Sequence, residues 1–77
     1  MEDILQAQNL ELVTLVGDAT HITVWRKLRV VVMRYSSGRR YVYRKLMVTA
    51  LSNLERALAE RGWRLQIGNA CRTVWTP

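Results

Sequence analysis

The chain has 77 residues, of which 49% are hydrophobic and 23% charged, so it has the composition of one small globular domain and is too apolar for a disordered chain. Twelve Lys and Arg residues against six Asp and Glu residues give a net charge of +6. The single cysteine, Cys71, excludes an internal disulfide, and the absence of a Cys or His partner at metal-ligand spacing disfavours a structural zinc site.

The first part of the chain predicts a short leading helix followed by β-strands. Residues 2–8 are expected to form one or two helical turns, with acidic residues at the favourable N-terminal end. The alternating side chains of 10–16 predict a strand, and the β-branched residues of 21–25 predict another after a turn. Residues 26–27 are either a bend or the middle of a strand that continues into 28–35.

A single amphipathic helix is predicted after the returning strand 39–46. The apolar residues that recur at helical spacing are Met47, Leu51, Leu54 and Leu58. Thr49 or Ser52 would be the N-cap, and Gly62 would be the left-handed glycine just after the C-terminus of the helix.

The last part of the chain predicts a hairpin of strands 63–67 and 70–76. Its register stays open, because a three-residue loop would pair Trp63 with Trp75 and a two-residue loop would not. Both tryptophans are expected in the core. The predicted fold class is therefore α+β: one domain over 1–77, with a small antiparallel sheet in the order β-β-β-α-β-β and one amphipathic helix packed on one face.

The loop length of the central hairpin decides which of its side chains share a face. A loop of two or four residues would place Tyr35 opposite Arg40 and would mix the character of both faces. A three-residue loop over 36–38 would place Tyr35 opposite Arg39 instead. Such a loop needs a left-handed residue at its third position, where Gly38 stands, so we predict the three-residue loop.

In this register one face of the sheet is predicted to be an apolar core and the other a mixture of cations and aromatic rings. The predicted core face, packed against the helix, holds Leu28, Val30, Val32, Val42 and Leu46. The predicted outer face holds Trp25, Lys27, Arg29, Val31, Met33, Tyr35, Arg39, Tyr41, Tyr43 and Lys45. Proteins bind single-stranded nucleic acid with this combination, since cations contact phosphates while rings stack on unpaired bases.

The distribution of charge along the chain supports the same function. Residues 1–20 hold four acids and no base, whereas 26–45 hold eight bases and no acid. We therefore expect a non-enzymatic protein that binds nucleic acid and prefers single-stranded DNA or RNA. The predicted phosphate contacts are Lys27, Arg29, Arg39, Arg44 and Lys45, and the predicted base-stacking residues are Tyr35, Tyr41 and Tyr43.

Two other functions fit the same residues. The basic face would also suit an acidic protein surface, as in a small viral or regulatory inhibitor. A metal-independent ribonuclease would use His21 with Arg39, Arg40, Tyr41 and Tyr43 to move protons and to stabilise charge at a phosphodiester, although no spacing supports it beyond composition. No catalytic residue, metal or cofactor is predicted.

The expected partners are thus nucleic acid or, in the alternative, an acidic protein, together with a second copy of the chain. A homodimer is expected because strands 10–16 and 70–76 would leave open sheet edges and a small domain gains from added burial. No apolar run approaches ~18 residues and no signal-peptide pattern begins the chain, so we expect no membrane contact and a cytoplasmic location.

Overall fold

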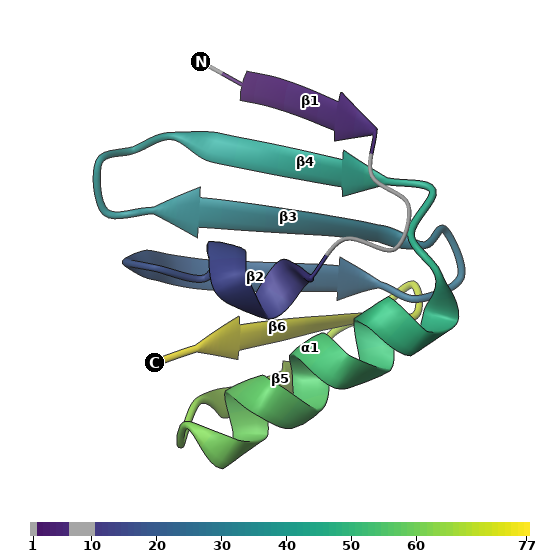
Figure 1. Ribbon diagram of the computed structural model, residues 1–77. Helices are drawn as coiled ribbons and strands as arrows, with labels where there is room; N and C mark the ends of the chain where they lie inside the picture. Colours follow the sequence, from purple (N-terminus) through teal and green to yellow (C-terminus); the bar gives the residue numbers. More distant parts are fainter. Residues whose placement is uncertain (1, 7–10) are drawn as a thin grey trace.

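The computed structural model describes the backbone of residues 2–6 and all of residues 11–77 (Figure 1). In chain order its elements are β1 (Glu2–Gln6), the 3-10 helix η1 (Leu12–Leu15), β2 (Ala19–Trp25), β3 (Val30–Tyr35), β4 (Arg40–Arg44), α1 (Val48–Glu60), β5 (Arg64–Ile67) and β6 (Arg72–Thr76). The predicted α+β class is confirmed, since β2 to β4, α1, β5 and β6 follow the order β-β-β-α-β-β. In the part of the chain described here, no helix is both long and apolar enough to cross a membrane.

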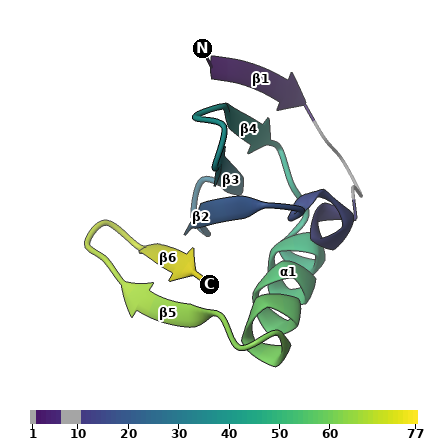
Figure 2. The ribbon, with the colours of Figure 1, turned by 90° about the vertical axis from the view of Figure 1, so that its left-hand side faces the viewer.

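The strands form one six-stranded sheet in the order β1-β4-β3-β2-β6-β5. The run from β4 to β5 is antiparallel throughout, and β1 adds to β4 in parallel at one edge. Both α1 and η1 lie on the same side of this sheet, and no described helix lies on the other side (Figure 2). The sheet therefore has one covered face and one uncovered face.

The core lies between the sheet and the two helical segments. The sheet contributes Ile22, Val24, Val31, Met33, Tyr43 and Trp75, and α1 contributes Leu51, Leu54 and Leu58. On η1 and just after it, Leu12 and Val16 are both buried and belong to the same core. Each fully buried aliphatic side chain of this kind stabilises the fold by about 1.5–3 kcal/mol.

The predicted three-residue loop of the central hairpin is confirmed. Val31 lies opposite Tyr43 and Met33 opposite Tyr41. The Tyr35 N–H donates to the Arg39 carbonyl at 2.9 Å, and the Gly38 N–H donates to the Tyr35 carbonyl at 2.9 Å. Gly38 has φ +90°, the left-handed backbone for which a glycine is needed.

The prediction of which hairpin face meets the helix is wrong. Val31 and Met33 are 0% exposed and Tyr43 is 3% exposed, whereas Leu28, predicted in the core, is 68% exposed. Val30 and Val32 are only half-buried and lie on the uncovered face, while Leu46 is buried as predicted. The reason is electrostatic: within the strands, the face of Val30 and Val32 also carries Arg34, Arg40 and Arg44, and burying those charges against α1 would cost several kcal/mol each.

Two predictions about the N-terminal region are also wrong. Glu2–Gln6 is a strand rather than a helix, because pairing with β4 supplies partners that local propensity does not reveal. Leu12–Leu15 is a 3-10 helix rather than part of a strand. Residues 7, 8 and 10 of those predicted elements lie outside the described residues.

The sheet edges consequently differ from those predicted. β1 and β5 are the outer strands, and β6 lies between β2 and β5. The open edges at 10–16 and 70–76 therefore no longer support the expected homodimer, which stays a prediction that rests on the small size of the domain.

The ends of α1 agree with the sequence in part. Its N-cap is Met47, with no side-chain hydrogen bond, so neither Thr49 nor Ser52 caps the helix. At the other end Gly62 has φ +82° as predicted, and the Trp63 N–H donates to the Leu58 carbonyl at 3.0 Å.

The C-terminal hairpin has a three-residue loop over 69–71. The loop has three residues, but it lies one position later than the loop that would pair Trp63 with Trp75, so Leu65 lies opposite Trp75 instead. Trp75 is buried, and Trp63 packs partly buried against the core. Cys71 is exposed in the loop.

Candidate nucleic-acid interface

The side of the sheet away from α1, which we call the open face, has an apolar middle. Because side chains alternate along each strand, residues that pair across neighbouring strands share a face. The pairs Val42–Val32, Val32–Thr23, Thr23–Val74 and Val74–Gln66 define a central stripe that runs from β4 to β5. The stripe is mostly buried or half-buried although no described helix covers it.

Arginines flank this stripe on both sides. At one end of the strands Arg40 pairs with Arg34, which pairs with His21, and Arg64 of β5 pairs with Thr76. At the other end Arg44 follows Tyr43, and Trp25 pairs with Arg72. The arginines of the open face are therefore Arg34, Arg40, Arg44, Arg64 and Arg72, of which Arg40 is half-buried and the others are exposed. The two sets stand four residues apart along a strand, about 13 Å.

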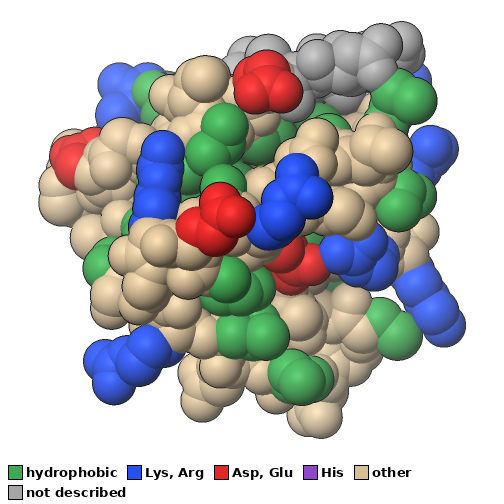
Figure 3. Space-filling model, turned by 60° about the horizontal axis from the view of Figure 1, so that its bottom comes forward, with side chains coloured by type: hydrophobic (Ala, Val, Ile, Leu, Met, Phe, Trp, Pro, Cys, Tyr) green, Lys and Arg blue, Asp and Glu red, His purple; other side chains and the backbone are tan. Residues whose placement is uncertain are grey.

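The acids whose side chains the structure describes lie elsewhere. Glu11 precedes η1, Asp18 accepts a hydrogen bond from the Ser36 hydroxyl in the connection to β2, and Glu55 and Glu60 are on α1. Figure 3 shows the lower side of the molecule, where acidic and basic side chains are interspersed among apolar ones. The open face, in contrast, carries only positive charge among its described side chains.

Four of the predicted phosphate contacts lie at one end of the sheet. Lys27 and Arg29 are exposed in the turn between β2 and β3, and Lys45 is exposed directly after Arg44. The Leu46 N–H donates to the Arg29 carbonyl at 3.1 Å, which holds the two segments together. The structure thus brings these four cations to the same end of the sheet as Trp25 and Arg72.

The three predicted stacking tyrosines are not on the open face. Tyr43 is buried in the core, and Tyr35 and Tyr41 pack half-buried against it. The Tyr35 hydroxyl donates to the Leu15 carbonyl at 2.5 Å, and the Tyr35 and Tyr41 rings meet edge to face at 5.4 Å. Burial raises the pKa of Tyr35 to about 12, and burial also raises the pKa of Tyr43. These rings stabilise the covered side of the hairpin. A single-stranded nucleic acid bound on the open face would not reach them.

Arg39, the remaining predicted site residue, also lies with the tyrosines. Its guanidinium carbon is 5.5 Å from the centroid of the Tyr41 ring, a cation–π distance. Arg39, the three tyrosines and Asp18 line a hollow on the covered side of the sheet. The Asp18 carboxylate disfavours a phosphate in this hollow.

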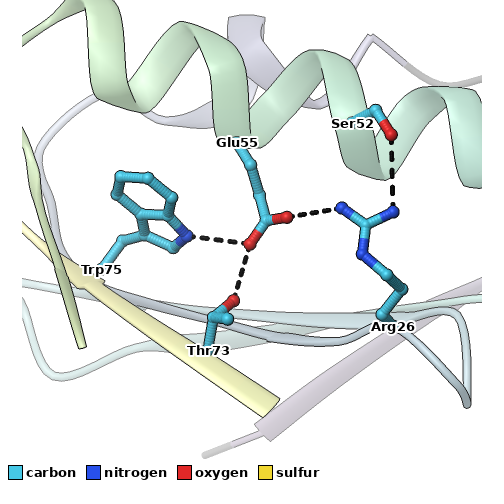
Figure 4. Close-up of polar contacts among 5 residues, drawn as sticks. All are labelled: Arg26, Ser52, Glu55, Thr73 and Trp75. Carbon is cyan, nitrogen blue, oxygen red and sulfur yellow. Dashed lines mark hydrogen bonds and ion pairs between the residues drawn. The ribbon is translucent and has the colours of Figure 1, made fainter. Parts of the chain in front are cut away.

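A cluster of polar side chains joins α1 to residues of β6 and to Arg26, which follows Trp25 (Figure 4). One oxygen of Glu55 accepts hydrogen bonds from the Thr73 hydroxyl at 2.6 Å and the Trp75 indole N–H at 3.0 Å. The other oxygen accepts from the Arg26 guanidinium at 2.5 Å, and Arg26 also donates to the Ser52 hydroxyl at 3.4 Å.

The Glu55 side chain is only 17% exposed, because it lies between α1 and the side chains of Thr73 and Trp75 on β6. Burial alone would raise the pKa of its carboxyl, but the hydrogen bonds from Thr73, Trp75 and Arg26 outweigh burial and lower the pKa below its ordinary value.

The groups expected for a ribonuclease are divided between the two faces. His21 is exposed on the open face beside Arg34, and its Nδ1 lies 3.0 Å from the Thr20 hydroxyl. Tyr41 and Tyr43 are on the covered face. Within residues 11–77, no three His, Cys, Asp or Glu side chains gather as metal ligands would.

Sequence reasoning placed Trp25 on the outer face with other cations, but it missed four arginines of the open face: Arg34, Arg40, Arg64 and Arg72. The signal was present for the first two, because the three-residue loop puts Arg34 opposite Arg40 on the face of Val32. Arg64 and Arg72 join them only through the pairing of β6 with β2, a contact between distant segments that no local pattern reveals.

Comparisons of the chain with protein-family models, with curated proteins and with solved structures found no match. The case for a function therefore rests on the geometry and charge of the open face.

Proposed function

We propose that this protein binds nucleic acid through its open face. The observation that carries the proposal is the presence of five arginines on one uncovered sheet face, with no acid among its described side chains: Arg34, Arg40, Arg44, Arg64 and Arg72. A polyanion is the partner whose charge complements such a surface.

The residue type supports phosphate as the contacted group. The guanidinium group is planar and offers five N–H donors in a fork that matches phosphate oxygens. Arg34, Arg44, Arg64 and Arg72 are exposed, so a phosphate backbone that crosses the sheet meets donors on either side of the valine stripe. Lys27, Arg29 and Lys45 extend the positive charge at one end.

Salt dependence of binding is the first test. If about five arginines neutralise phosphates, log Kobs against log salt should have a slope of about −3.5 for a single strand, so affinity falls about 10²-fold between 50 and 200 mM salt. Fluorescence anisotropy with labelled DNA and RNA of mixed sequence measures this slope. Salt-independent binding, or none at 50 mM salt, would contradict the proposal.

A charge-matched pair of variants tests the face. Arg34→Gln with Arg44→Gln removes two charges from the open face, and Arg56→Gln with Arg61→Gln removes two from α1 and its C-cap. We expect the first variant to reduce the single-strand salt slope by about 1.4 and the second to leave it nearly unchanged.

Equal reductions of the salt slope in both variants would mean that net charge alone attracts the nucleic acid.

The half-buried valines of the open face favour a second candidate, an acidic protein partner. A complex with a purified protein that survives nuclease treatment, together with negligible nucleic-acid affinity, would replace the proposal by that candidate.

A further inference from the structure

One corner of the open face combines an aromatic ring with cations. Trp25 is the last residue of β2 and Arg72 the first residue of β6, and the two are paired across the strands. Val24, the residue before Trp25, is buried under α1, so the Trp25 side chain lies on the opposite, open face. Its burial is only intermediate, which leaves part of the indole accessible to a ligand.

The Arg72 side chain lies over Gly68 of the neighbouring hairpin arm. Gly68 is opposite Arg72, and its N–H donates to the Arg72 carbonyl at 3.0 Å. A Cβ at Gly68 would lie 2.8 Å from Arg72 Nε and 3.1 Å from Arg72 Cγ, so the arginine side chain passes over the glycine toward β5. The guanidinium therefore leans away from Trp25 while it stays on the same face.

Both strand ends are held from the other side of the sheet. Glu55 binds Arg26, the residue after Trp25, and Thr73, the residue after Arg72 (Figure 4). A single carboxylate on α1 thus bonds to the side chains of the residues that follow the ring and the cation in the chain. Sites built on strands fixed in this way lose little order when a ligand binds.

We propose that Trp25 and Arg72 form a site for one unpaired base and its phosphate. This site rests on the proposed function, and it makes the protein prefer single strands over duplexes. The base stacks on the indole, and Arg72 contacts the adjacent phosphate. Arg44, Lys27 and Arg29 at the same end of the sheet attract the rest of the backbone. The bases of a duplex stay stacked on one another, so a duplex is attracted by the charge of this face but does not stack on the Trp25 indole.

The experiment compares a labelled single strand of about 10 nucleotides with the duplex of the same sequence, for wild type and three variants of Trp25. Trp25→Ala should weaken single-strand binding about 5- to 100-fold and duplex binding less than about 2-fold, because stacking acts on unpaired bases alone. Trp25→Leu keeps apolar bulk without a π-face and should lose as much as Trp25→Ala, while Trp25→Phe should retain most of the affinity.

Variants of Arg72 and Arg56 complete the test. Arg72→Ala should weaken both forms and reduce the salt slope by about 1, and Arg56→Ala on α1 should change neither. Single-strand affinity that is unchanged in Trp25→Ala, that is retained in Trp25→Leu, or that falls in parallel with duplex affinity would overturn the Trp25 site while leaving the proposed function in place. The absence of binding to any DNA or RNA would overturn both.

Discussion

The two faces of the sheet are built from the same strands and differ in what covers them. On the covered face Val31, Met33 and Tyr43 meet α1 and η1 and are almost wholly buried. On the open face their chain neighbours Val32, Arg34 and Arg44 have no helix of the described residues above them. A single alternating segment therefore specifies a core and a charged surface at once, and the position of charges within the strands decides which is which.

The largest effect should come from breaking the covered face at Tyr43. Tyr43→Ala removes a ring that is 3% exposed, and it should lower the free energy of unfolding by about 3–5 kcal/mol. That loss is a large part of the ~5–15 kcal/mol total of a typical domain. Arg44→Ala, one residue further along β4 on the open face, should change it by about 0.5 kcal/mol or less. Urea unfolding measures both, and similar losses for the two variants would contradict the assignment of the faces.

The sequence predicts the hairpin better than the surface that the hairpin presents. Gly38 is enough to predict the register, because turn chemistry is local. The orientation of the hairpin against α1 depends on which of its two faces would bury fewer charges within the strands. All the cations that the sequence predicts on the tyrosine face, Lys27, Arg29, Arg39 and Lys45, fall outside β3 and β4. Burial of that face therefore buries no charge within these two strands.

The remaining parts of the candidate site depend on contacts between distant segments. β1 is a strand because of β4, and Arg72 joins Trp25 because β6 pairs with β2. The helical position of Glu55 alone does not reveal Thr73 and Trp75 across from it. Local patterns in the sequence contain none of these pairings.

The next largest effect should come from the polar cluster that joins the covered face to the corner of the open face. Glu55→Ala leaves the Thr73 hydroxyl, the Trp75 indole N–H and Arg26 without their shared acceptor, and we expect a loss of about 2–3 kcal/mol. For a domain of this size that corresponds to a fall in Tm of about 10–20 °C. Glu60→Ala, an exposed acid on the same helix, is the matched control and should shift Tm by a few degrees at most.

The same carboxylate predicts a dependence on pH. Folding lowers the pKa of Glu55 below the ordinary value of 4.5. As the pH falls, Glu55 is therefore protonated in the unfolded chain at a higher pH than in the folded protein. The stabilisation from Glu55 is therefore complete above about pH 5.5 and is lost as the pH falls through 4.5 and the lower folded pKa. Between pH 6 and 3, the Tm of wild type should fall more than the Tm of Glu55→Gln in thermal unfolding. Parallel plots of Tm against pH for the two proteins would contradict the hydrogen bonds assigned to the Glu55 carboxylate.

The smallest expected effect concerns the turn that sets the two faces apart. Gly38 has φ +90° with no atom within 4 Å of an added Cβ, so Gly38→Ala meets backbone strain but no clash. The left-handed backbone costs an L-residue about 1–2 kcal/mol, and the lower entropy of the unfolded chain offsets about 0.5 kcal/mol, which leaves a net loss of about 1 kcal/mol. Gly38→Asn should lose less, because asparagine tolerates a left-handed backbone better. If urea unfolding finds Gly38→Ala as stable as wild type, the loop does not hold this conformation in solution, and the separation of Tyr43 from Arg34 and Arg40 must come from the helix alone.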